Sequence, residues 1–265
     1  MSHVLNENVQ INMKKALNTL PAAPDDAYEE IMNRIKNAGR YSQGTAFRTL
    51  AWICHAARPL QMDELREALA VHEAWLDKEE ITQLPFGVDD YGAADIVKNC
   101  QSLVRHDAAS GIVRFAHPTV QLFLEGQDIP RASDLAMTCI AFLGFDEFAR
   151  DRPDIRNRLV DHKFYSYAAR FWALHTKGEA ENCKNIQRAL VRLLSDENKT
   201  NAMLQAWAGM TSEFTRGQTW LHILAIVGLE TVSKIIFERD PERKDRYVLS
   251  ATLLKVPCAG RIIQY

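Results

Sequence analysis

The sequence predicts a mainly α fold that contains one small β-hairpin. Apolar residues recur at helical spacing through most of the 265-residue chain, as Tyr28, Ile31, Met32 and Ile35 do in its first helix. The stretch around Asp107–Gly111 differs, because two short apolar segments flank a Gly- and Ser-containing turn. With 47% hydrophobic and 25% charged residues, the composition is that of a globular protein with one or two cores.

The first half of the chain has the element order of a winged helix: three helices, a hairpin and a closing helix. The helix before Arg58-Pro59 must end there, and Pro118 suits the first turn of the closing helix. Residues 72–92 are less regular and are predicted to form a loop or insertion. The three helices are predicted around Phe47–Cys54, at Met62–Val71 and at Ala93–Leu103, and the closing helix at Pro118–Leu124. A further helix, which begins at Pro24, precedes them.

After a polar joint at 127–131 the chain returns to helical spacing, and we expect a helical arm there. Its predicted helices are Leu135–Phe148, Phe164–His175, Glu181–Leu194 and Ala202–Trp207.

Residues 217–239, GQTWLHILAIVGLETVSKIIFER, have the pattern of a single ankyrin repeat. The pattern departs at Trp220, where the repeat has proline, and at Leu224, where it has alanine. Large side chains at these positions suit a terminal repeat that packs on a different neighbour. The matching positions are Gly217, Thr219, Leu221, His222, Ala225, Gly228, Val232, Lys234, Ile235 and Ile236.

Further motifs occur before the repeat. They are ALNTLPAAPDDAYEEIMNRI, RPLQMDELREAL, DIVKNCQSLV with VRFAHPTVQLFL, and FYSYAARFWALH. In this order the motifs resemble the region between the NACHT ATPase and the ankyrin array in fungal NACHT–ankyrin proteins of the STAND (NOD-like receptor) class. The same winged helix also occurs in an inositol deacylase, which implies no hydrolase activity here.

The resemblance implies five segments. They are a linker helix at 1–40 that leaves a NACHT module outside this chain, a winged-helix domain at 41–127, a helical arm at 128–212, an ankyrin-like repeat at 213–240 and an irregular tail at 241–265.

The resemblance also implies one cofactor contact, at His117. In STAND proteins a histidine at the start of the closing winged-helix helix can touch the β-phosphate of ADP. This chain has no G-x-x-x-x-G-K-[ST] phosphate loop, so no cofactor is expected in the chain itself, and ATP or ADP only in a supplied NACHT module. The alternative is a structural histidine at a helix N-terminus.

Protein partners are expected on the repeat, and their candidate contacts are Trp220, His222, Val232, Ile235 and Ile236. His222 would otherwise hydrogen-bond neighbouring turns, and His175 is expected to be a packed structural residue. The apolar face of 229–237 should be covered by the C-terminal tail or drive self-association.

Other classes are disfavoured by composition. A net charge of −2, and a helix at 93–103 that carries Asp95 and Lys98, leave only Arg105 and Arg114 on the hairpin for a nucleic-acid backbone. No apolar run is long enough to span a membrane, and G-x-S-x-G and H-E-x-x-H do not occur. No metal site is expected.

Five scattered cysteines and no signal peptide indicate a cytoplasmic protein. The predicted function is a non-catalytic connector that couples a nucleotide switch to an ankyrin sensor array. The alternatives are a free-standing interaction adapter and, less favoured, a DNA-binding winged helix.

Overall fold

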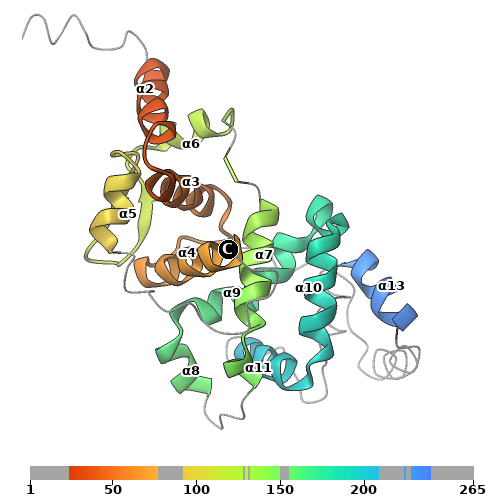
Figure 1. Cartoon of the computed structure of the whole chain (residues 1–265). Coiled ribbons are helices and arrows are strands. Elements are labelled where there is room, and N and C mark those ends of the chain that lie inside the picture. The colour runs from red at the N-terminus through yellow and green to blue at the C-terminus, as the bar shows by residue number, and fades with distance from the viewer. Residues whose placement is uncertain are drawn as a thin grey trace, which may run out of the picture.

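The chain is mainly helical with one two-stranded antiparallel hairpin in the computed structural model, as the sequence predicts (Figure 1). The structure describes residues 24–76, 92–127, 129–130, 132–149, 155–208, 224 and 228–239. Within these residues, no helix is long and apolar enough to cross a bilayer.

The first seven elements form the winged-helix module. Its sheet extends beyond the hairpin, because Val113 N donates to Leu60 O at 3.0 Å and Met62 N donates to Gly111 O at 2.8 Å. The elements are α2 (Pro24–Lys36), α3 (Arg40–His55), α4 (Met62–Leu76), α5 (Ala93–Asn99), β1 (Val104–His106), β2 (Val113–Phe115) and α6 (Pro118–Leu124).

Two boundaries in this module differ from the sequence prediction. Helix α4 continues to Leu76, into the segment predicted as a loop, and residues 77–91 lie outside the described part. Helix α5 ends at Asn99 rather than Leu103, because Gln101 and Ser102 adopt φ of 50° and 72°, which a helix does not allow. That turn directs the chain into β1.

The elements after α6, from α7 to α11, form the arm. The helix predicted at 135–148 is interrupted at Gly144, and helix α8 was not predicted. The elements are α7 (Ala132–Leu143), η2 (Asp146–Ala149), α8 (Ile155–Asp161), α9 (Lys163–Thr176), η3 (Gly178–Asn182), α10 (Lys184–Ser195) and α11 (Glu197–Ala208). Helix α13 (Glu230–Arg239) packs on α10 and η3 (Figure 1).

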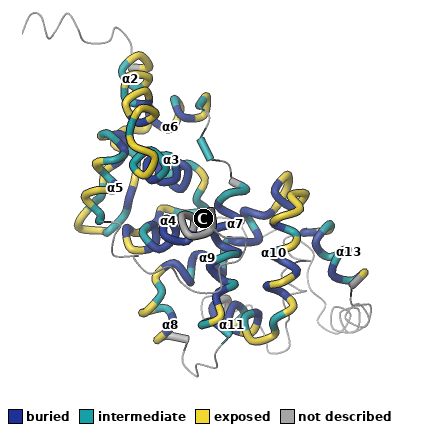
Figure 2. The backbone as a smooth tube through the Cα atoms, in the orientation of Figure 1, coloured by how far each residue is buried: buried dark blue, intermediate teal, exposed yellow. Residues whose placement is uncertain are grey.

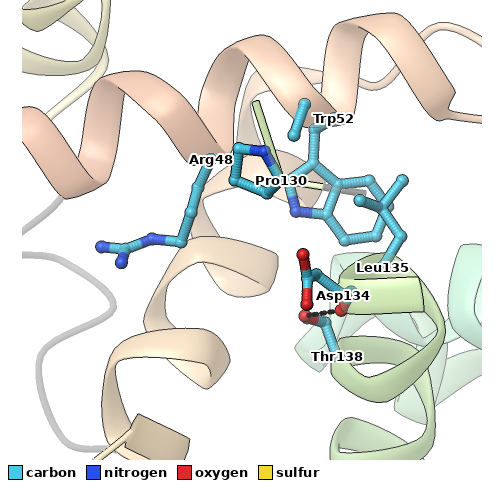
Figure 3. A pocket seen from close by; sticks show the side chains of 7 residues that line it. Arg48, Trp52, Pro130, Asp134, Leu135 and Thr138 are labelled. Atoms are coloured by element: carbon cyan, nitrogen blue, oxygen red, sulfur yellow. Dashed lines mark hydrogen bonds between the residues drawn. The ribbon is translucent and has the colours of Figure 1, made fainter. Parts of the chain in front are cut away.

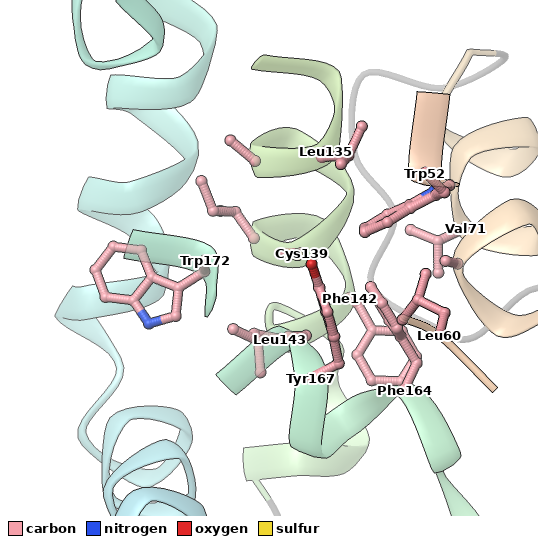
Figure 4. Packing of buried hydrophobic residues seen from close by; sticks show 14 of the residues in the cluster. Trp52, Leu60, Val71, Leu135, Cys139, Phe142, Leu143, Phe164, Tyr167 and Trp172 are labelled. Carbon is pink, nitrogen blue, oxygen red and sulfur yellow. The ribbon is translucent and has the colours of Figure 1, made fainter. Parts of the chain in front are cut away.

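The core is continuous from the winged-helix module into the arm. Buried backbone runs from α3 and α4 into α7 and α9, whereas α2, α5 and the outer side of α10 are largely exposed (Figure 2). Trp52 and Val71 of the first module face Phe142 and Phe164 of the arm across this boundary (Figure 4). Burial of such large side chains is the main stabilising term of a domain.

Candidate functional site

His117, the predicted phosphate contact, is the N-cap residue of α6. Its Nδ1 accepts a hydrogen bond from Thr119 N at 3.3 Å and lies 2.8 Å from Thr119 Oγ1, which also bonds the Tyr28 hydroxyl at 2.7 Å. A side-chain acceptor at this position satisfies one of the free N–H groups of the first turn. The histidine therefore has a structural role in the chain, and its nucleotide role stays a prediction.

The predicted partner residues lie partly outside the described residues, which do not include Trp220 and His222. Val232 is 0% exposed and Ile236 is 5% exposed, whereas Ile235 is only half-buried. Helix α13 packs on α10 and η3, so the chain itself covers these two side chains. The partner role of the five residues stays a prediction.

Helix α13 begins at a carboxylate from another element, Glu181 of η3. Glu181 is 8% exposed, and its Oε1 accepts hydrogen bonds from Thr231 N at 2.6 Å and Val232 N at 3.1 Å. Ahead of the helix, Gly228 adopts a φ of 78°, which glycine allows without strain. Glu181 thus caps α13 from 50 residues away. We call this contact the second joint, because a similar cap at Glu67 precedes it along the chain.

The winged-helix module and the arm are connected by the same device, at Glu67 of α4. Glu67 is 8% exposed, its Oε1 accepts from Lys163 N at 2.9 Å, and its Oε2 accepts from Phe164 N at 3.0 Å. Burial raises the pKa of the Glu67 carboxyl, while the two N–H groups partly offset that rise. Glu67 therefore caps α9, and we call the contact of α3 and α4 with α9 the first joint.

An ion pair stands beside Glu67 in the first joint. Arg58 Nη1 donates to Glu64 Oε2 at 2.8 Å and Nη2 donates to Oε1 at 2.6 Å, and this bond to Glu64 raises the pKa of the guanidinium. The same carboxylate accepts from Gln61 N at 2.9 Å. The Arg58 guanidinium also lies 5.1 Å from the centre of the Tyr167 ring. A bidentate pair of this kind fixes direction as well as charge.

Tyr167 joins the two modules by hydrogen bonds. Its hydroxyl accepts from Ala57 N at 2.8 Å and lies 2.8 Å from His175 Nε2. Burial lowers the pKa of His175 to about 4, and the nearby His55 adds to that effect. His175 is therefore neutral at pH 7, and its tautomer sets which of the two groups donates in this hydrogen bond. His175 is buried, as predicted.

A ring cluster completes the first joint. The Trp52 ring meets those of Phe164, Tyr167 and His175 edge to face, with centroids 5.3, 5.6 and 6.2 Å apart. Edge-to-face pairs add to the free energy of burial, by about 0.5–1.5 kcal/mol each. The joint is thus both apolar and hydrogen-bonded.

A small hollow lies near this joint, between α3 and the start of α7 (Figure 3). Its empty space is about 210 Å³ including the part open to solvent, which is less than the roughly 300 Å³ at which small-molecule sites begin. Figure 3 shows the Arg48 guanidinium directed away from it, and Thr138 Oγ1 donates to Asp134 O at 2.8 Å. The hollow does not have the size of a nucleotide or metabolite site.

The winged helix has few cations on the elements that would read DNA. Helix α5 exposes Asp95 beside Lys98, and the hairpin places Arg105 directly opposite Arg114. Arg114 also lies 3.5 Å from the carboxylate of Asp107. DNA binding usually needs several phosphate contacts, so this surface gives it little support.

The joint roles of Glu67 and Glu181 are not among the sequence predictions. Glu181 is a charged residue on a 3₁₀ turn next to buried positions, and that is its only local signal. Arg58, Glu64, Glu67 and Tyr167 fall inside motifs that carry the family resemblance, so the sequence holds a signal for them.

Residues 32–138 match the family model described as the winged helix domain of GPI inositol-deacylase. The match begins in α2 and ends in α7, so it starts earlier and ends later than the predicted 41–127 segment. A winged-helix domain is therefore present. Nothing among the curated proteins or the solved structures matches the chain.

Proposed function

We propose that this chain is a non-catalytic connector in a cytoplasmic signalling protein of the STAND class. It couples a nucleotide-switch module that precedes it to an ankyrin sensor array that follows it, through protein–protein contacts. The match to a winged-helix family that also occurs in NACHT-type proteins supports the first half of this proposal. The ankyrin-like pattern of 217–239 supports the second half.

The observation that carries the proposal is the pair of joints. Glu67 caps α9 at Lys163 and Phe164, and α9 leads directly through η3 to Glu181, which caps α13. A shift of α4 must therefore move α9 or leave the N–H groups of Lys163 and Phe164 without their acceptors. The Phe164 bond is buried, and the loss of an acceptor by a buried group costs about 1–3 kcal/mol. This continuous path can carry a displacement from the winged helix to α13.

His117 belongs to the same proposal at the other end of the chain. Its ring lies on the exposed surface at the start of α6, where a preceding NACHT module would have access to it. There it would lend one ring nitrogen to a nucleotide phosphate while Nδ1 holds the Thr119 turn. This contact requires the NACHT module and has no role in the isolated chain.

Hydrogen exchange of the whole chain tests the coupling. Glu67→Gln should raise amide exchange in α9 and also in residues 228–239, because the perturbation passes through η3. Asp63→Asn is the matched control, because it removes one carboxylate from the exposed side of the same helix. Faster exchange confined to α4 and α9 would contradict a connector. Hydrolysis of ATP by the purified chain would contradict its non-catalytic character.

The competing function is a free-standing interaction adapter. The coding sequence on either side separates the two: a phosphate-loop motif upstream with further ankyrin copies downstream supports the connector. If the flanking coding sequence has neither the phosphate-loop motif nor further ankyrin copies, the adapter is supported.

A further inference from the structure

Helix α10 carries a row of cations on its outer surface. Lys184, Arg188 and Arg192 follow one another at intervals of four residues, and all three are exposed. Residues four apart lie on one side of a helix, so the three charges form one stripe along it. The sequence of α10 has no acidic residue, and the opposite face is buried in the arm.

The α10 stripe is unfavourable for the helix itself. Like charges four residues apart repel, and Lys184 lies in the first turn, where the helix dipole favours anions. The N-cap residue Cys183 makes no side-chain hydrogen bond that would offset this. Arg188 is held in place at the surface, because its Nη2 donates to Asn185 Oδ1 at 2.5 Å. The three exposed cations are therefore a positive surface that the energetics of α10 as a helix do not favour.

A complementary surface occurs at the other end of the molecule, on α2. Its first two turns expose four carboxylates, those of Asp25, Asp26, Glu29 and Glu30. Two pairs among these carboxylates have the spacing of the α10 cations, namely Asp25 with Glu29 and Asp26 with Glu30. Each pair would lie parallel to a helix that carries cations four residues apart. Helix α2 projects from the winged helix, far from α10, so it cannot reach the stripe of its own chain (Figure 1).

We propose that a second copy of this chain docks the acidic turns of its α2 on the α10 stripe. The contact joins two different surfaces, so it is head-to-tail and can continue from one copy to the next. This contact goes beyond the proposed connector function, because it joins separate copies of the chain, whereas the connector acts within one copy. The charges steer the encounter and set the register, and salt weakens the contact.

Sedimentation of the whole chain at about 0.05 M and about 0.5 M salt tests the proposal. The wild type should show a concentration-dependent increase in mass at low salt that is lost at high salt. Lys184→Glu with Arg188→Glu should weaken association by about tenfold or more, and so should Glu29→Lys with Glu30→Lys. These four side chains are exposed, so both double variants should retain the wild-type circular dichroism and melting temperature.

Mixing the two double variants gives the decisive result. The variant changed on α10 keeps the wild-type acidic turns of α2, and the variant changed on α2 keeps the wild-type stripe. Association should therefore return in the mixture, as pairs that form one such contact, although each variant alone is monomeric. Lys98→Glu with Arg105→Glu is the matched control: it reverses two exposed cations away from the stripe and should associate like the wild type. A wild type that stays monomeric at low salt, or a mixture that does not associate, overturns the proposal. A control variant that loses association to the same extent also overturns it.

Discussion

The two joints contain the same kind of contact, a glutamate that caps a helix. In each, a buried glutamate accepts two consecutive backbone N–H groups at the start of a helix from another part of the chain. Glu67 uses one oxygen for each N–H group, whereas Glu181 presents a single oxygen, Oε1, to both. Both carboxylates thus cap a helix with two hydrogen bonds, and they differ in how many of their oxygens accept them.

The surroundings of the two glutamates differ more than the caps do. The first joint adds the Arg58–Glu64 pair, the Tyr167 hydrogen bonds and the rings around Trp52. The second adds the apolar contact of α13 with α10 and η3. A carboxylate cap thus specifies where a helix begins, and the apolar surface around it determines whether the joint opens separately from the rest of the fold.

The largest expected effect comes from the ring at the centre of the first joint. Trp52→Ala removes a 3% exposed indole that three other rings contact, and truncations of this kind cost about 3–5 kcal/mol. Urea unfolding should show the loss in one transition, because the core runs through both modules. Leu122→Ala, at a 67% exposed position, is the control and should change stability by less than about 0.5 kcal/mol. Two separate transitions in the wild type would show that the modules unfold independently.

Glu67 should have the next largest effect. Glu67→Ala leaves the N–H groups of Lys163 and Phe164 without their acceptors and should cost about 2–4 kcal/mol. Glu67→Gln keeps one acceptor oxygen and removes a buried charge, so it should cost about half as much. Thermal unfolding measures both variants. Equal losses would mean that the side-chain volume, rather than the cap, stabilises the joint.

Local signals explain which parts of this fold could be predicted. The hairpin turn and α6 were placed correctly, because Gly111 permits the φ of 71° in the turn and Pro118 fixes φ in the first turn of α6. Helix α8 was missed, because Ile155–Asp161 has only seven residues, and the single i, i+4 pair of Ile155 with Leu159 is too short a pattern to indicate a helix. Boundaries were predictable where proline fixes φ or glycine permits a positive φ, and helices were predictable where one face is apolar.

The joints could not be predicted, because their chemistry is long-range. Glu67 contacts residues 96 and 97 positions away, and Glu181 contacts residues 50 and 51 positions away. Nothing in the local sequence indicates which helix either glutamate caps. Their partners are backbone N–H groups, which every residue except proline has. The side-chain pattern of the sequence therefore does not indicate the contact.

The first joint should also make stability depend on pH. The pKa of His175 is about 4 in the folded chain and about 6.5 when unfolded, so between these values the unfolded state binds the extra proton. The free energy of unfolding should therefore fall as pH falls from 6.5 to 4, by roughly 3 kcal/mol from this residue. Urea unfolding of the wild type and of His175→Asn over this range isolates the contribution. An unchanged slope in the variant would assign the pH dependence to other groups.

The smallest effect on global stability is expected at the second joint. This prediction tests most directly whether the two joints differ. Glu181→Gln weakens the acceptor of Thr231 N and Val232 N, while α10 and η3 still cover Val232 and Ile236. Global stability should change by less than about 1 kcal/mol, because α13 lies at the edge of the core.

The local effect should be much larger than the global one. Amide exchange in 228–239 should rise about tenfold, which corresponds to about 1.4 kcal/mol of local opening, while α9 keeps the wild-type exchange. Glu179→Gln is the matched control, because it removes an exposed carboxylate from the same 3₁₀ turn. If Glu181→Gln instead lowered global stability as much as Glu67→Gln, the two joints would be equal parts of one cooperative unit. In that case α13 could not move separately, and a signal could reach it only by displacement of the whole arm.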